Sequence, residues 1–328
     1  MNTFAVGVDL GGTMIKAALV ERGQGIRELV SIDTLAEEGP EPVIDRIAGL
    51  VRRLASAASA DSILGIGIGA PGAVNWERTS VSRAPNLPGW DVINLQTALQ
   101  SRLGAAFPVI VENDANVAGL GSAHYGAGLP FDSFILVTLG TGVGGAIIYQ
   151  NTIFRGATGG AGEIGHMTID YEGPFDRSGV AGAIEAYLGQ RFLSRHARYQ
   201  LLNRPDSVIH KMTGGDLEKI TPKMLHEAAL AGDAAVQSVL AWAGHKLGCI
   251  LGSAINLLDI RKVIVGGGVS AAGDYILKPA YDSMVRFVMP GLRDGLEIIR
   301  EHLGNEVGML GAAHLVFEYH DGHVSASS

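Results

Sequence analysis

The chain has 328 residues, of which 47% are apolar and 18% charged; it can bury a sizeable core, which excludes a disordered protein. The formal net charge is −8, with 25 Lys and Arg against 33 Asp and Glu, which argues against a protein that coats nucleic acid. Glycine is the outlier, with 46 residues, about twice average usage. The glycines gather after apolar runs, a pattern typical of ligand loops built from backbone.

The location of the protein is predicted from its first residues, its apolar runs and its cysteine content. The first residues lack a basic segment followed by a long apolar one, and no apolar run reaches about 18 residues without a glycine. The single cysteine, Cys249, excludes an internal disulfide and a cysteine-rich zinc site. We therefore expect a cytoplasmic protein with neither a membrane nor a nucleic acid as partner.

The first part of the chain is predicted to alternate strands and helices. Its short apolar runs predict strands at residues 4–9, 15–20, 63–68 and 109–112. The segment Gly11-Gly12-Thr13 predicts a turn that joins the first two strands into a hairpin. Apolar residues recur at helical spacing after Glu41-Pro42, where a proline near the first helical position favours a helix start.

A second block repeats the arrangement of strand, Gly/Thr turn and strand. Its predicted elements are strands at 134–139, 146–149 and 263–265 and helices within 182–195, 221–258 and 311–319. Two copies of one unit indicate two related lobes, and the alternation of strands and helices indicates an α/β fold with mixed sheets. We expect an N-terminal lobe at residues 1–118, a C-terminal lobe at 119–310, and a closing helix and tail at 311–328 that pack back on the N-terminal lobe.

Three glycine-rich segments follow predicted strands: Asp9-Leu10-Gly11-Gly12-Thr13, Leu139-Gly140-Thr141-Gly142 and Gly266-Gly267-Gly268. Glycine lets backbone N–H groups approach a phosphate, and a carboxylate at a strand end, such as that of Asp9, can hold magnesium. A tight hairpin turn explains the first segment equally well when it is taken alone. Three such segments in order are more specific, although none has the spacing of a P-loop or of a dinucleotide-binding fingerprint.

Polar residues in two further segments suggest chemistry on a hydroxyl group. In Glu112-Asn113-Asp114-Ala115-Asn116, an Asp can accept a proton from a hydroxyl during phosphoryl transfer, and Asn113 can bind sugar hydroxyls. The alternative is an Asx turn that caps the next helix, a role that suits Asn116. Glu163, His166 and Glu185 form a second polar set suited to vicinal hydroxyls, although a satisfied, partly buried His166 is the more common case.

Taken together, the order and spacing of these motifs resemble the ROK family (repressors, open reading frames and sugar kinases) of the actin-like ATPase superfamily. The resemblance runs from about Phe4 to Tyr319 and also includes Ala70-Pro71-Gly72 and the segment Ala84-Pro85-Asn86-Leu87-Pro88-Gly89-Trp90. It implies a two-lobed actin-like (ribonuclease-H-like) fold with mixed sheets flanked by helices. It also implies phosphorylation of a hexose by ATP with Mg2+, with glucose at its 6-hydroxyl as the leading substrate.

The resemblance further implies roles for individual residues. Asp114 matches the family's catalytic base, and Asp9 matches a residue that holds magnesium directly or through water. The residues that match sugar ligands are Gly72, Asn86, Asn113, Asp114, Glu163, His166 and Glu185. The residues that match nucleotide contacts are Asp9, Gly11, Gly12, Thr13, Gly140, Thr141, Gly142 and Gly267.

One departure from the family concerns the loop that follows His166. Many members carry cysteines there that bind a structural zinc ion together with the histidine. In this chain the matching positions are Asp176, Ser178 and Ala183, and an alanine side chain cannot coordinate a metal. We therefore predict no structural zinc and a His166 that serves the sugar alone. Asp176 and Arg177 either supply local contacts or are solvent-exposed loop charges.

Other readings stay open beside that of a glucokinase-like enzyme. A sugar-responsive repressor would need a DNA-binding domain before the first phosphate motif, and Asp9 follows only eight residues. A catalytically silent sugar-binding protein would not require both Asp9 and Asp114. Among kinases, the alternative acceptors are fructose, mannose, allose, N-acetylmannosamine and N-acetylglucosamine, and the alternative donor is polyphosphate. A homodimer also stays open, because residues 228–258 suit a core helix as well as an interface.

Overall fold

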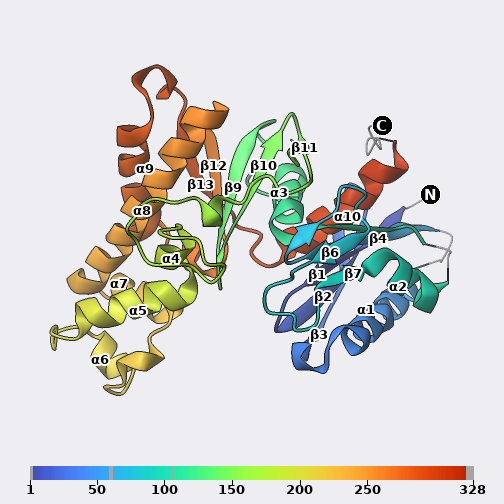
Figure 1. The fold of residues 1–328 in the computed structure, drawn as a ribbon, viewed down its shortest axis with the longest axis horizontal. Helices are drawn as coiled ribbons and strands as arrows, with labels where there is room; N and C mark the ends of the chain where they lie inside the picture. Colours follow the sequence, from blue (N-terminus) through green and yellow to red (C-terminus); the bar gives the residue numbers. More distant parts are fainter. Residues whose placement is uncertain (1–2, 59–61, 105–106, 323–328) are drawn as a thin grey trace. The chain divides into compact units, whose positions relative to one another are not determined.

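The computed structural model describes residues 3–58, 62–104 and 107–322, which fall into two compact units (Figure 1). Unit 1 comprises residues 1–132, 146–162 and 305–328, and unit 2 comprises residues 133–145 and 163–304. The boundary expected at 118/119 falls inside helix α3 (Asp114–Tyr125), which the structure keeps whole in unit 1. The closing helix, α10 (Glu306–His320), is grouped with unit 1 and begins five residues earlier than expected. Residues 323–328 of the expected tail lie outside the described residues.

Unit 1 is built on a mixed five-stranded sheet of order β3-β2-β1-β4-β8. Its strands are β1 (Phe4–Leu10), β2 (Met14–Glu21), β3 (Gly25–Asp33), β4 (Ile63–Ala70) and β8 (Val109–Asn113). β1 is antiparallel to β2 and parallel to β4, and β4 is parallel to β8. A smaller sheet joins β5 (Ala73–Val74), β6 (Ser80–Ser82) and β7 (Val92–Asn94). The hairpin and the later strands predicted for this region are confirmed.

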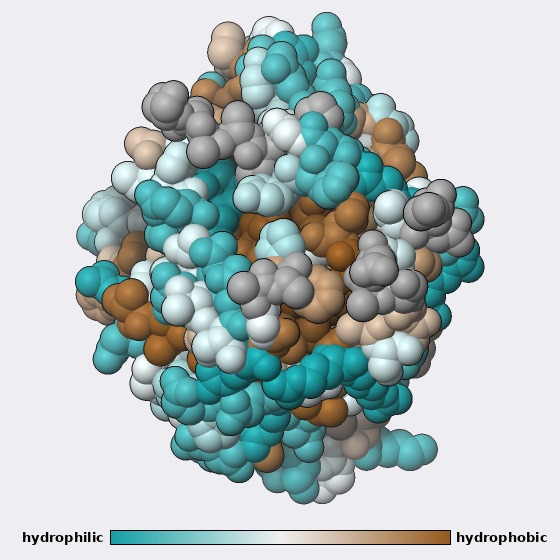
Figure 2. Space-filling view, turned by 90° about the vertical axis from the view of Figure 1, so that its right-hand side faces the viewer, coloured by the Kyte–Doolittle hydropathy of each residue, from teal (hydrophilic) through white to brown (hydrophobic). Residues whose placement is uncertain are grey.

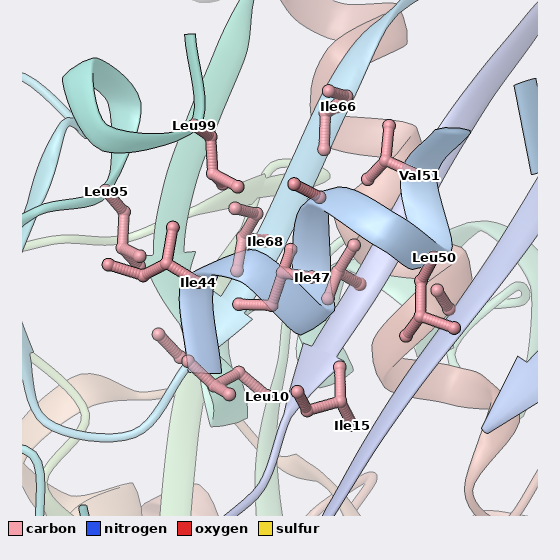
Figure 3. Packing of buried hydrophobic residues seen from close by; sticks show 14 of the residues in the cluster. Leu10, Ile15, Ile44, Ile47, Leu50, Val51, Ile66, Ile68, Leu95 and Leu99 are labelled. Atoms are coloured by element: carbon pink, nitrogen blue, oxygen red, sulfur yellow. The ribbon is translucent and has the colours of Figure 1, made fainter. Parts of the chain in front are cut away.

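Helices α1 (Pro40–Ala55) and α2 (Leu95–Leu103) belong to the main apolar core of unit 1. Figure 3 shows Ile44 and Ile47 of α1 near Ile66 and Ile68 of β4, and all four side chains are almost completely buried. Burying a side chain of this size contributes about 1.5–3 kcal/mol, so the spacing of apolar residues in α1 fixes this helix to the sheet. The face shown in Figure 2 is mainly polar around a central apolar area, as is ordinary for a folded protein.

The opposite face of the sheet carries α10 and α3. Successive residues of a strand alternate between faces, so Gly67 points away from Ile66 and Ile68 and toward α10. A Cβ on Gly67 would overlap the carbonyl oxygen of Ala312 in α10. Glycine at this position therefore lets the backbone of α10 approach the sheet closely. α3 packs against α10 on the same face, which brings the helix that begins with Asp114 onto the sheet.

A second sheet has the order β11-β10-β9-β12-β13. Unit 2 contains β9, β12, β13, the start of β10 and most of the remaining helices, whereas β11 and residues 146–149 of β10 are grouped with unit 1. The strands are β9 (Phe134–Leu139), β10 (Val143–Tyr149), β11 (Thr152–Ile153), β12 (Lys262–Gly266) and β13 (Glu297–Arg300). The α-helices are α4 (Glu185–Leu188), α5 (Gln190–Leu201), α6 (Ile209–Met212), α7 (Pro222–Leu230), α8 (Ala234–Leu258) and α9 (Asp274–Phe287). The start of the helical region predicted within 221–258 is confirmed, since α7 begins at Pro222 and the Thr221 hydroxyl accepts a hydrogen bond from Met224 N.

The long helix α8 packs along α9 through small residues. Gly244, Gly248 and Gly252 recur every four residues, and a Cβ on any of them would collide with α9. α8 is long and apolar enough to span a membrane by length and composition, but 61% of its apolar window is buried. This pattern is typical of a core helix, the reading that the sequence left open beside an intermolecular interface.

Candidate functional site

The register of three strands sets the positions of the predicted site residues of unit 1. β1, β4 and β8 are mutually parallel, with Asp9 opposite Gly69 and Ala70 opposite Asn113. The carboxyl ends of these strands therefore meet at one edge of the sheet, where open α/β sheets bind ligands. The structure places at or after these strand ends the predicted residues Asp9, Gly11, Gly12, Thr13, Gly72, Asn113 and Asp114.

The first glycine-rich segment is a hairpin turn, and it lies beside the predicted sugar-binding loop. Gly11 N donates to Met14 O (3.0 Å), and the Thr34 hydroxyl donates to Gly11 O (2.6 Å). A Cβ on Gly12 would lie 2.8 Å from the Cβ of Asn86. The segment thus forms the predicted hairpin turn, and this turn sets its backbone next to Asn86.

Asp9 lies at the end of β1 in a half-buried setting. Its burial raises the pKa of the carboxyl group, and Lys16, the residue opposite in β2, acts in the other direction. On the helix side, Asp9 lies next to Gly308 of α10: a Cβ on Gly308 would lie 3.9 Å from Asp9 Oδ1. A carboxylate held in poorly solvated surroundings gains from a nearby cation. An oxygen ligand of this kind fits Mg2+.

Asn113 and Asp114 occupy the start of α3. Asn113 Oδ1 accepts hydrogen bonds from the backbone N–H groups of Ala115 (2.9 Å) and Asn116 (3.2 Å), and its Nδ2 donates to Gly72 O (3.2 Å). The helix cap is therefore Asn113 rather than Asn116, and it ties Gly72 to the strand end. Asp114, the first residue of the helix, is exposed. The helix N-terminus favours a negative charge there.

Asn116 and its neighbour Glu112 form a buried polar network that sequence reasoning did not assign. Glu112 is completely buried; its Oε2 accepts from Arg78 Nε (2.8 Å) and lies 2.9 Å from Arg155 Nε. Its Oε1 accepts from Asn113 N (2.9 Å) and from Asn116 Nδ2 (3.0 Å). The signal that could have found it is a Glu at the end of an apolar strand, because a carboxylate at a buried position needs cationic partners.

Two glycine-rich turns of unit 2 lie side by side. β9 and β12 are parallel neighbours, with Thr138 opposite Gly266. Gly267 has a φ of 82°, and a Cβ on it would overlap the backbone of Leu139, so only glycine fits. The predicted nucleotide contacts Gly140, Thr141, Gly142 and Gly267 are thereby brought to one edge of the sheet.

Glu185 and the turn Ile164–His166 pack against the start of β10, in the same unit. Glu185 Oε2 accepts from Val143 N (2.9 Å), directly beside Gly142. A Cβ on Gly165 would overlap Val143 O, so the turn that contains His166 also touches this strand. His166 Nε2 lies 3.8 Å from Glu163 Oε2. The predicted sugar ligands Glu163, His166 and Glu185 are thus gathered around Val143.

The loop after His166 is organised around Asp176, whose carboxylate is completely buried. Asp176 Oδ2 lies 2.6 Å from His166 Nδ1, and Oδ1 accepts from the Ser178 hydroxyl (2.8 Å), Ser178 N (2.8 Å) and Val180 N (2.9 Å). Burial opposes ionisation of Asp176, but the hydrogen bonds from His166, Ser178 and Val180 together hold its pKa below the usual value. The expectation of local contacts is confirmed for Asp176, and that of a solvent-exposed charge is wrong for it.

The two units therefore carry glycine-rich turns at the ends of parallel strands, and one of these turns shares a sheet edge with a carboxylate at a helix N-terminus. This combination is typical of α/β proteins that bind phosphate groups. The family model of the ROK family matches residues 5–318, and the chain belongs to this family.

Curated relatives and a solved structure extend the match over nearly the whole chain. The glucokinase of Thermotoga maritima is 33% identical over 313 residues, covering 95% of this chain and 97% of that protein. The glucokinase of Streptomyces coelicolor is 36% identical over 320 residues, covering 95% and 97%. A ROK family glucokinase from Streptomyces griseus, solved with glucose and AMPPNP, superposes with a TM-score of 0.83 at 33% identity, covering 95% and 98%. The predicted family and the predicted fold class, an actin-like α/β fold with mixed sheets, are confirmed.

Proposed function

We propose that the chain transfers a phosphoryl group from ATP to the 6-hydroxyl of glucose, with Asp114 as the catalytic base. The observation that carries the proposal is the placement of Asp114 on the sheet edge that also holds Asp9 and the turn Gly11–Thr13. The relatives named glucokinase, similar along nearly their full length, support both the reaction and the sugar. The chain is accordingly an ATP-dependent sugar kinase.

The geometry supports distinct proposed tasks for the residues of unit 1. Asp114 is exposed at the start of α3, and a carboxylate at this position can accept the proton of the attacking hydroxyl. The cap formed by Asn113 fixes the first turn of α3 and thereby the position of that carboxylate. Backbone N–H groups of the Gly11–Thr13 turn are suited to hold phosphate oxygens, since catalysis of phosphoryl transfer depends mainly on positioning and charge stabilisation.

Asp9 is the residue that would hold magnesium, because its carboxylate is half-buried and gains from a cation. When bound, Mg2+ supplies positive charge to the phosphate groups of the nucleotide. The set of proposed sugar ligands is completed by Asn86, Gly72, Glu163, His166 and Glu185. The proposal includes a cytoplasmic location, partners limited to hexose and ATP, and a loop at residues 173–185 that is stable without zinc.

A hexose panel tests the proposal. Purified protein is supplied with ATP and Mg2+, and ADP release is measured with glucose, fructose, mannose, allose, N-acetylmannosamine and N-acetylglucosamine, and again with polyphosphate as donor. We expect the highest kcat/KM on glucose with ATP. Preference for another acceptor or donor would keep the mechanism and overturn the substrate. Absence of turnover on every sugar would favour a silent sugar-binding protein.

The base is tested by Asp114→Asn, which keeps the shape of the side chain and removes its ability to accept a proton. We expect kcat to fall by a factor of about 10²–10⁴ or more with an unchanged free energy of unfolding. Asp132→Asn, which changes an exposed acid of unit 1 that is none of the proposed site residues, serves as the matched control. Equal activity of wild type and Asp114→Asn would remove Asp114 from the mechanism.

A further inference from the structure

The two carboxylate oxygens of Asp176 have separate partners. Oδ1 accepts from the Ser178 hydroxyl, Ser178 N and Val180 N, at 2.8–2.9 Å, and so holds the turn of residues 176–180. Oδ2 lies 2.6 Å from His166 Nδ1. One oxygen therefore stabilises the loop, and the other contacts the imidazole of His166, a proposed sugar ligand.

The surroundings of His166 Nδ1 determine where its proton lies. An ionised carboxylate accepts hydrogen bonds and cannot donate one. The lowered pKa of Asp176 favours the ionised form, so Oδ2 is an acceptor. The second neighbour is the Ser178 hydroxyl at 3.3 Å, whose own proton is donated to Asp176 Oδ1. Both neighbours of Nδ1 thus accept, and Nδ1 must donate. A neutral imidazole protonated at Nδ1 has its lone pair at Nε2.

We propose that Asp176 is a positioning residue that fixes His166 as a hydrogen-bond acceptor at Nε2. There, Nε2 accepts a hydrogen bond from a hydroxyl group of the sugar. The inference rests on the proposed function, because that function makes His166 a sugar ligand. Glu163 Oε2, 3.8 Å from Nε2, is a second acceptor on the same side of the ring. Two acceptors at one point select a substrate position that carries a free hydroxyl, and they reject one that carries fluorine or an O-methyl group, which cannot donate.

Three substitutions separate the contact with His166 from the integrity of the loop. Asp176→Asn keeps an oxygen for the three loop hydrogen bonds and turns the partner of Nδ1 into an N–H donor. The imidazole must then accept at Nδ1, and its proton moves to Nε2. Asp176→Ala removes both functions, whereas Ser178→Ala leaves the Asp176–His166 contact in place.

The first readout is the tautomer of His166, observed by long-range 15N–1H NMR on histidine-labelled protein and assigned with His166→Gln. We expect protonated Nδ1 and unprotonated Nε2 in the wild type and in Ser178→Ala, and the opposite tautomer in Asp176→Asn. A wild type protonated at Nε2, or the same tautomer in Asp176→Asn, would overturn the inference. This measurement needs no turnover, so it decides the role of Asp176 even if the kinase assay fails.

The second readout is calorimetric binding of glucose and of its monodeoxyfluoro and O-methyl analogues. We expect the wild type to lose affinity about tenfold or more for the analogue altered at the hydroxyl that faces Nε2, and Asp176→Asn to discriminate much less at that position. For glucose itself we expect Asp176→Asn to bind about 10–100-fold more weakly, the range known for residues that orient a metal-binding histidine. Equal discrimination by both proteins would refute the acceptor role, and absence of any sugar binding by the wild type would refute the proposed function instead.

Discussion

Two carboxylates of unit 1 occupy opposite environments, and this difference separates their proposed roles. Asp114 is exposed at the N-terminus of α3, where the helix favours its charge. Asp9 is half-buried at the end of β1, where burial raises its pKa. A base must meet the substrate hydroxyl, whereas a metal ligand gains from poor solvation once the cation is present. The two environments therefore suit Asp114 to proton transfer and Asp9 to magnesium.

Replacing Asp9 by Asn is expected to stabilise the metal-free protein while it abolishes activity. The pKa of Asp9 is raised in the folded state, so its ionised form lowers the free energy of unfolding increasingly as the pH rises through that pKa. Asn carries no charge and avoids this cost. Thermal unfolding in EDTA at pH 3 and pH 8 should show a higher Tm for Asp9→Asn at pH 8 and a smaller difference at pH 3, below the ordinary pKa of an aspartate. A lower Tm for the variant at pH 8 would contradict this account of Asp9.

At the scale of an element, the network of Glu112 holds the segment that leads into α3. The carboxylate of Glu112 pairs with Arg78 and Arg155 and accepts from Asn113 N. Arg155 also donates to the carbonyl groups of Asn75 and Trp76. The network therefore connects three separate stretches of unit 1 directly behind the helix cap.

We expect Glu112→Gln to lower the free energy of unfolding by about 3–5 kcal/mol, because removing one partner leaves two largely buried guanidinium groups without their countercharge. Glu41→Gln is the matched control: Glu41 pairs with Arg102 but its side chain is 74% exposed, so its loss should cost less than about 1 kcal/mol. Urea unfolding of the three proteins measures the difference. Costs of similar size for the two variants would show that the Glu112 network does not stabilise unit 1.

α3 and α10 also share a titratable cluster formed by His124, His314 and Glu318. The two imidazoles are stacked, with 3.5 Å between centroids and 17° between planes, and each Nε2 lies 4.0 Å from Glu318 Oε1. Parallel rings direct their nitrogen lone pairs side by side rather than at one point, so we assign the cluster to titration rather than to a metal ion. Burial is the main cause that raises the pKa of Glu318 to about 7 and lowers that of His314 to about 3.

These shifts predict a stability that depends on pH with opposite signs. Glu318 stabilises the fold fully below about pH 4.5 and loses that contribution as the pH rises through 7. The contribution of His314 instead increases as the pH rises from about 3 to 6.5 and is complete above 6.5. Glu318→Gln isolates the first effect: at pH 8 we expect it to raise the free energy of unfolding by about 3 kcal/mol, and at pH 4 by less than about 1 kcal/mol. The same difference between variant and wild type at both pH values, measured by urea unfolding, would exclude a raised pKa.

Sequence reasoning identified the elements with strong apolar patterns and missed the others. The core strands β1, β2, β4, β8, β9 and β12 were predicted because they are buried on both faces and form continuous apolar runs. β3 was missed because only Val30 in it is buried, which leaves little alternation to detect. A helix was expected after the glycine-rich segment Gly266-Gly267-Gly268, and α9 confirms it. Its bounds were not predicted, because Pro279 lies inside α9 and interrupts the helical pattern.

At the scale of the whole molecule, the two units divide the predicted site residues. Unit 1 contains the predicted base, the magnesium ligand and the first glycine-rich turn; unit 2 contains the other two turns and the set Glu163, His166 and Glu185. Motif order alone identified the family, since each motif follows a strand and strand ends are where such sheets bind ligands. Contacts between distant side chains, such as Asp176–His166 and Glu112–Arg155, could not be predicted because no spacing in the sequence encodes them.

The central claim is that this chain uses Asp114 to phosphorylate glucose at its 6-hydroxyl. The most direct measurement is the formation of glucose 6-phosphate from glucose and ATP–Mg2+, followed with a dehydrogenase specific for that product, in wild type, Asp114→Asn and Asp132→Asn. The account predicts rapid formation of this product by the wild type and by Asp132→Asn, and a loss of about 10²-fold or more in Asp114→Asn. A wild type that forms no glucose 6-phosphate, or an Asp114→Asn variant that forms it at the wild-type rate, would contradict it.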